Sequence, residues 1–182
     1  MKITVILGSP HKKGTTALLA ENFVKGAQAA GNDVFVFDAA HSDITGCIGC
    51  DYCRRNGQCS KDDDAKELNK EVVNSDLIAF VTPLYYYGMS AQLKAAIDRF
   101  YAVNDDIKDK GIKAVLLAAS ADDEEGNDAL KHHYDCICGY LGLEDMGKVI
   151  AAECETVNDV KGTRYLEDAF ELGASLNSVG IH

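Results

Sequence analysis

The sequence predicts an α/β fold in which a five-stranded parallel sheet has helices on both faces. Two observations support this prediction. Short apolar runs rich in β-branched residues recur along the chain, and each is followed by a segment with apolar residues at helical spacing. No repeat, linker or low-complexity tract interrupts this alternation, so we expect a single domain over residues 1–182.

The first predicted unit joins a strand over residues 3–7 to a helix over about 15–30. The strand is an apolar run, and Gly31 stands where a helix C-terminal cap belongs. The turn between them, residues 8–14, is small and polar. Backbone N–H groups and hydroxyls converge where such a turn enters a helix, so this turn is predicted to bind a phosphate.

Four further strand–helix units complete the pattern. The strand over 77–81 is apolar without interruption, as expected when helices cover both faces of a parallel sheet. Ser90 is predicted to cap the helix that follows it, and Gly142 to end the next helix. The other strands are expected over 34–37, 112–118 and 149–152, and the other helices over 62–73 and from Thr163 onward.

Ligands of such sheets bind beyond the carboxyl ends of the strands, which selects three loops: 8–16, 82–90 and 119–127. The first lacks the lysine of a P-loop and the spacing of a dinucleotide fingerprint, so its hydroxyls suit a phosphate monoester such as that of FMN. The second has three consecutive tyrosines, on which a planar ring can stack. The alternatives are a plain strand-to-helix turn and tyrosines that pack under their own loop.

Four of the seven cysteines form a C-x2-C-x2-C-x5-C pattern within residues 47–59. Four thiolates so close in sequence are typical ligands of an iron–sulfur cluster, and zinc is an alternative. Cysteines that pack as small apolar residues, or redox-labile thiols, are the other interpretations. We expect the three later cysteines, Cys136, Cys138 and Cys154, to be structural.

The formal net charge of −11 argues against nonspecific binding to nucleic acid. No apolar run approaches the length of a membrane span, and the first residues do not resemble a signal peptide. We therefore expect a soluble cytoplasmic protein without a nucleic-acid or membrane partner.

Taken together, these segments resemble the NADPH-dependent FMN reductase group of flavodoxin-like flavoproteins, which includes the iron–sulfur flavoproteins of anaerobes. The resemblance covers nearly the whole chain. It implies a flavodoxin-like sheet of order 2-1-3-4-5, bound FMN and a homodimer or tetramer. The segments that carry it are residues 8–16, the cysteine pattern, and residues 83–88 and 91–99.

The same resemblance assigns roles to individual residues. Ser120 is expected to contact the cofactor from the loop after the fourth strand, and Cys47, Cys50, Cys53 and Cys59 form a candidate [4Fe–4S] site. The acidic loop 121–125 argues against the cluster, because it resembles the corresponding loop in a branch of the family that keeps similar cysteines without iron. The expected contacts of the FMN phosphate are Ser9, His11, Lys13, Gly14, Thr15 and Thr16, and those of the flavin ring are Pro83, Leu84, Tyr85, Tyr86, Tyr87 and Gly88.

The function expected from this combination is an FMN-dependent NAD(P)H oxidoreductase. Its acceptor would be a quinone, a free flavin, a nitroaromatic compound or an electron-transfer protein. The flavin performs the chemistry, so the sequence singles out no catalytic side chain. The alternatives are an iron–sulfur flavoprotein that relays single electrons, and a redox or metal sensor built on the four cysteines.

Overall fold

The computed structural model describes residues 1–176 and has a parallel sheet in the order β2-β1-β3-β5-β6. A sixth strand, β4, pairs antiparallel with the end of β3. The predicted order 2-1-3-4-5 is therefore confirmed for the parallel strands, while the predicted number of strands was one too few. The strands are β1 (Lys2–Leu7), β2 (Asp33–Asp38), β3 (Leu77–Tyr85), β4 (Gly88–Met89), β5 (Lys113–Ala119) and β6 (Glu144–Ala151).

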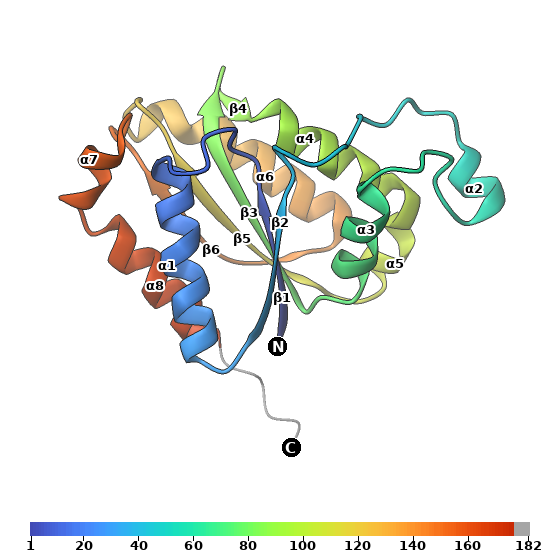
Figure 1. Ribbon diagram of the computed structural model, residues 1–182, viewed down its shortest axis with the longest axis horizontal. Helices are drawn as coiled ribbons and strands as arrows, with labels where there is room; N and C mark the ends of the chain where they lie inside the picture. The colour runs from blue at the N-terminus through green and yellow to red at the C-terminus, as the bar shows by residue number, and fades with distance from the viewer. Residues whose placement is uncertain (177–182) are drawn as a thin grey trace.

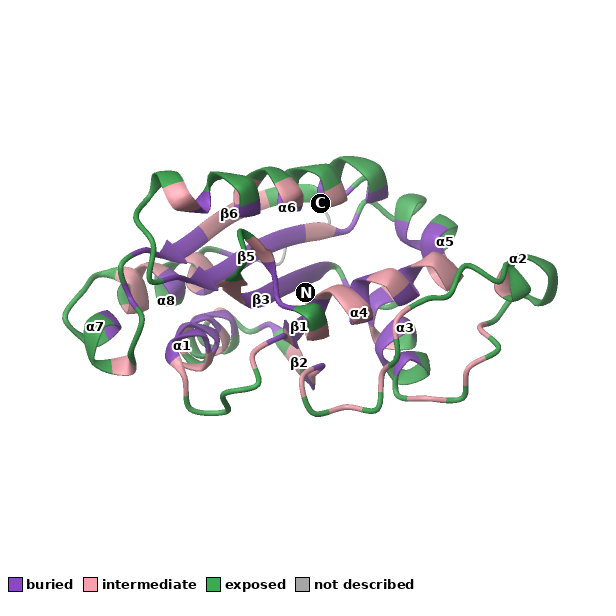
Figure 2. Cartoon of the chain, turned by 90° about the horizontal axis from the view of Figure 1, so that it is seen from above, coloured by how far each residue is buried: buried purple, intermediate pink, exposed green. Residues whose placement is uncertain are grey.

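Helices cover both faces of the sheet, as Figure 1 and the view from above in Figure 2 show. One face packs against α1 (Thr15–Ala29), α7 (Val157–Lys161) and α8 (Tyr165–Ser175). The short helix α2 (Tyr52–Asn56) lies on a segment that extends away from the sheet (Figure 1). The opposite face packs against α3 (Ala65–Val73), α4 (Ala91–Asp98), α5 (Asn104–Lys108) and α6 (Asp128–Leu141).

The described residues also include two 3₁₀ turns: η1 (Arg99–Val103), which follows α4 directly, and η2 (Glu125–Asn127), which precedes α6. Strands β3 and β5 lie in the middle of the sheet, and both are buried almost throughout. Their side chains alternate between two apolar cores, one on each face, which explains their uninterrupted apolar sequences. No helix in the described part of the chain is long and apolar enough to cross a membrane.

Helices α1 and α8 cross at two glycines. A Cβ atom built on Gly26 would lie 2.1 Å from the carbonyl oxygen of Phe170, and one built on Gly173 would lie 2.2 Å from that of Phe23. Both distances are far shorter than a van der Waals contact, so only glycine allows this close approach of the two backbones.

Three segments differ from the sequence-based expectation. Strand β3 continues past Thr82 and Pro83 to Tyr85, because its last residues pair with β4 as a hairpin. Strand β6 begins at Glu144 rather than near 149; it pairs with β5 alone, so its first residues are polar and do not show a strand pattern. The last helix begins at Tyr165 rather than at Thr163.

Candidate functional site

An open cleft of about 810 Å³ lies at the carboxyl edge of the sheet. It brings together the loop after β1, the end of β3, the loop after β5 and the loop after β6. The three loops selected from the sequence therefore do meet in one place. The lining residues are Ser9–Thr16, Pro83–Tyr85, Ala119–Ala121 and Cys154–Val157.

The loop after β1 is fixed at its start by a close contact with α4. A Cβ atom on Gly8 would lie 2.6 Å from Cβ of Leu93, so no other residue fits at this position. The buried hydroxyl of Ser90 donates to the carbonyl oxygen of Gly8 over 2.6 Å and accepts the N–H of Leu93 over 3.2 Å. Ser90 therefore caps α4, as predicted, and also ties α4 to the loop.

The N-terminus of α1 faces the cleft, and no side chain among the described residues caps its backbone N–H groups. Gly14 is its N-cap and provides no side-chain hydrogen bond, and the first turn holds no acidic residue. Lys12 and Lys13 line the same cleft. The positive end of the helix dipole and two lysines thus give this end of the cleft an electropositive character suited to an anion.

Thr15 provides the sharpest indication of a ligand. Its side-chain oxygen is buried and has no hydrogen-bond partner among the described residues, an arrangement that is costly unless a ligand or water supplies the partner. Thr15 is the first residue of α1, and the next residue, Thr16, is also buried. The phosphate of FMN fits this donor set, because its oxygens accept both hydroxyl and backbone N–H groups.

His11 has a structural role within the same loop. Its backbone N–H donates to the hydroxyl of Ser9 over 3.2 Å, and its carbonyl oxygen accepts the N–H of Gly14 over 3.0 Å. These bonds close the turn, while the imidazole remains exposed. The turn therefore holds its shape through its backbone and leaves the imidazole beside the cleft.

The predicted ring-binding residues divide between two places. Pro83, Leu84 and Tyr85 line the cleft, whereas Tyr86 and Tyr87 form the turn between β3 and β4 with positive φ angles of 47° and 62°. Such angles are unusual for aromatic residues, and Tyr86 is fully exposed, at 102%. Both tyrosines border an adjoining hollow of about 410 Å³, and Gly88 lies in β4 beyond either lining.

The loops after β5 and β6 form the opposite wall. Ser120 lies at the cleft, as expected, and its carbonyl oxygen accepts the N–H of Cys154 over 2.7 Å. The segment Cys154–Val157 was not among the predicted site residues, although the rule that selected the other loops applies equally to the end of β6. Burial, followed by the nearby charges of Asp159 and Glu153, raises the pKa of the Cys154 thiol, so this side chain is a neutral part of the wall.

The four cysteines of the predicted cluster site do not line this cleft. They lie on the segment that carries α2. All four are free thiols that line one small cavity of about 20 Å³, roughly the space of one water molecule. Among the described residues, no three His, Cys, Asp or Glu side chains are close enough to hold one metal ion. A single metal ion therefore does not fit the thiols as they are arranged here.

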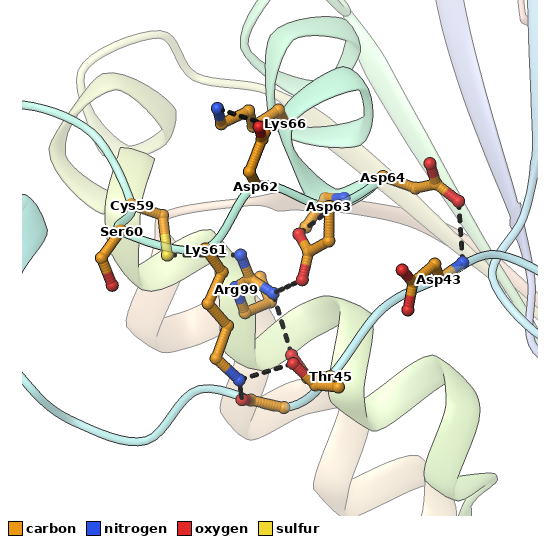
Figure 3. A network of polar contacts seen from close by, with 12 residues as sticks. Asp43, Thr45, Cys59, Ser60, Lys61, Asp62, Asp63, Asp64, Lys66 and Arg99 are labelled. Atoms are coloured by element: carbon orange, nitrogen blue, oxygen red, sulfur yellow. Dashed lines mark hydrogen bonds and ion pairs between the residues drawn. The ribbon is translucent and has the colours of Figure 1, made fainter.

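Arg99 in η1 organises this segment (Figure 3). Its guanidinium donates to the carboxylate of Asp63 over 2.6 Å, to the carbonyl oxygen of Thr45 over 2.9 Å and to the sulfur of Cys59 over 3.2 Å. The exposed fractions of the two charged side chains are only 1% for Arg99 and 9% for Asp63. Burial alone would raise the pKa of Asp63, but the hydrogen bond and charge of Arg99 outweigh it and hold this pKa below its ordinary value.

Comparisons with known proteins agree with this geometry. A family model described as NADPH-dependent FMN reductase matches residues 1–156. An iron–sulfur flavoprotein of Methanocaldococcus jannaschii is 35% identical over 66% of this chain and 63% of its own length, and one of Archaeoglobus fulgidus is 34% identical over 69% and 58%. The chain thus spans about three fifths of the length of these curated relatives.

A solved structure extends the similarity to the whole fold. The NAD(P)H:quinone oxidoreductase from Methanothermobacter marburgensis superposes with a TM-score of 0.80 at 19% identity, and the match covers 100% of this chain and 98% of that one. At this level of identity the likeness supports the fold alone.

Proposed function

Since the chain belongs to the NADPH-dependent FMN reductase family, we propose that it is an FMN-dependent NAD(P)H oxidoreductase. Its electron acceptor would be a small aromatic molecule, such as a quinone, a free flavin or a nitroaromatic compound, or an electron-transfer protein. A relative of Thiobacillus denitrificans, 33% identical over 48% of each chain, is named an FMN-dependent NADH:quinone oxidoreductase, which supports this class of acceptor.

The observation that carries the proposal is the buried hydroxyl of Thr15, which has no partner among the described residues, at the uncapped N-terminus of α1. The cleft continues from this point between the end of β3 and the loop after β5. A phosphate at one end and a gap bounded by two loops along the rest suit a molecule with one phosphate and one flat ring.

The residues of the chain would bind and orient FMN, which supplies hydride and electron transfer when bound. The hydroxyls of Ser9, Thr15 and Thr16 and the N–H groups of the loop would hold the phosphate. Leu84 and Tyr85 would flank the ring from one side and Ser120 from the other. The segment after β6 would border the cofactor as part of the same wall.

The test is a spectroscopic titration of protein purified without oxygen. We expect a flavin spectrum that bleaches on addition of NADH or NADPH and recovers when a quinone is added. The same protein stripped of FMN serves as the control and should not oxidise the nucleotide until FMN is restored. A colourless protein that takes up no added FMN would refute the proposal.

The second candidate is an iron–sulfur flavoprotein that relays single electrons. The cysteine spacing and the names of the two archaeal relatives favour it. The thiols as arranged here do not form a site for a single metal ion, and we derive no step through a cluster. Iron and sulfide analysis of the same preparation distinguishes the two candidates.

We further propose that residues 1–182 act as a single FMN-binding domain that assembles as a homodimer or tetramer. An open groove of about 580 Å³ between α4 and α6 supports an assembly, because apolar side chains line it, including the exposed Tyr140 and the half-buried Ile137. Light scattering after size-exclusion chromatography measures the mass. A monomer at all concentrations would contradict the proposed assembly without affecting the flavin chemistry.

A further inference from the structure

The cysteine segment, residues 43–64, is held by two side chains of η1. Arg99 contacts it near both ends, at Thr45 on one side and at Cys59 and Asp63 on the other. Tyr101, two residues later, donates from its hydroxyl to Asp51 over 2.7 Å and accepts the N–H of Arg54 over 2.6 Å. One short turn therefore contacts the start, the middle and the end of the segment.

Arg99 gives up its contact with water to make these bonds, which is unusual for an arginine. Figure 3 shows its guanidinium between two irregular stretches of the segment, with Cys59 and Asp63 on one stretch and Thr45 on the other. The sulfur of Cys59 is turned onto the guanidinium at 3.2 Å. Since a charge without a partner is costly in the interior, these contacts depend on one another and favour a single conformation of the segment.

We propose that Arg99, rather than a metal ion or cluster, folds the cysteine segment, and that it is a positioning residue for Cys59. Loops whose only order comes from metal ligands lose their structure when the metal is removed. This segment instead rests on a buried ion pair and on hydrogen bonds from η1. It keeps its shape with or without a thiolate-bound group, so such a group could be loaded or lost without unfolding the domain.

Hydrogen exchange of the backbone amides tests the proposal in protein treated to remove iron. The variants are Arg99→Lys, which keeps the charge but cannot reproduce the planar fork that reaches three acceptors, and Cys53→Ala, which removes a thiol of the same cavity that Arg99 does not contact. We expect wild type and Cys53→Ala to protect residues 43–64 equally. In Arg99→Lys, exchange in this segment should be at least tenfold faster.

Two further measurements separate this role from a general loss of stability. FMN binding and exchange in the loop after β1 should be unchanged in Arg99→Lys, because that loop lies at the other site. Thiol labelling followed by mass spectrometry should show a higher ratio of modified Cys59 to modified Cys53 in this variant, since both thiols are half-buried and only Cys59 is covered by Arg99.

The opposite pattern would overturn the inference. If iron-free wild type exchanges residues 43–64 as fast as Arg99→Lys, and iron with sulfide restores protection in both, the cluster folds the segment. Equal loss of protection in Cys53→Ala and Arg99→Lys would also refute it. Neither result would affect the proposed reductase activity, which the FMN titration tests separately.

Discussion

Replacing Thr15 by valine tests the phosphate site through two effects of opposite sign. Valine has the same shape but lacks the hydroxyl, which is buried in the free protein with no partner among the described residues. Leaving such a group unsatisfied costs about 1–3 kcal/mol, so the free energy of unfolding of the FMN-free protein should rise by about this amount. The FMN-bound protein should lose a hydrogen bond to a charged phosphate, worth about 1.5–3 kcal/mol.

Because the free variant is stabilised and the bound variant is destabilised, the two effects add in the binding free energy, to about 2.5–6 kcal/mol. The Kd for FMN should therefore increase by about fiftyfold or more. Flavin fluorescence titration measures this Kd, and urea denaturation of the FMN-free protein measures stability. Riboflavin is the control ligand, because it lacks the phosphate and should bind wild type and Thr15→Val equally. An unchanged Kd for FMN, or an FMN-free variant less stable than wild type, would refute the assignment of Thr15 to the phosphate.

Three other perturbations test the fold and the thiols. Gly173→Ala should lower the free energy of unfolding by about 1–3 kcal/mol in urea denaturation, because its Cβ would lie 2.2 Å from the carbonyl oxygen of Phe23. Burial raises the pKa of Asp145, but Lys148 and hydrogen bonds outweigh burial and hold this pKa below the ordinary 3.8. Wild type should therefore be more stable than Asp145→Asn above about pH 4, and this difference in the free energy of unfolding should disappear as the pH falls further. Hydrogen bonds from the backbone of Tyr52 and the side chain of Ser60 lower the pKa of the Cys50 thiol. An alkylating reagent should therefore label this exposed cysteine first at neutral pH, which mass spectrometry measures.

Each of these predictions has an internal control. Gly162→Ala places its Cβ in open space and should leave the stability unchanged. A stability difference between wild type and Asp145→Asn that stays constant from neutral to acidic pH would contradict the ion-pair explanation. Burial raises the pKa of Cys138 to about 11, so this cysteine should stay unlabelled; labelling of Cys138 before Cys50 would contradict the assigned environments.

The parallel sheet was predictable because its central strands are buried on both faces. Such strands leave an uninterrupted apolar sequence, as in 77–81, which local patterns detect. The first half of β6 was not predictable in this way, because an edge strand tolerates polar residues. The β3–β4 hairpin was also missed, because its turn holds Tyr86 and Tyr87 where asparagine and glycine are usual.

The cleft at the carboxyl edge of the sheet was largely predictable because its residues follow strands, and the carboxyl ends of parallel strands meet at one edge. That rule located the loop after β1 and Ser120. It would also have located Cys154 if it had been applied to the loop after the fifth predicted strand. The role of Arg99 was not predictable from spacing. A buried arginine next to a cysteine depends on two segments 40 residues apart, and no local pattern records such a contact.

The crossing of α1 and α8 has a consequence for how this fold can be divided or recombined. The family match ends at residue 156, yet α8, at Tyr165–Ser175, lies beyond it and touches α1 backbone to backbone. Helix α1 begins directly after the loop that follows β1, so a chain truncated at the end of the match would expose the apolar side of this helix. Exchange of modules between relatives should therefore transfer α1 and α8 as a pair, even though they stand at opposite ends of the described chain.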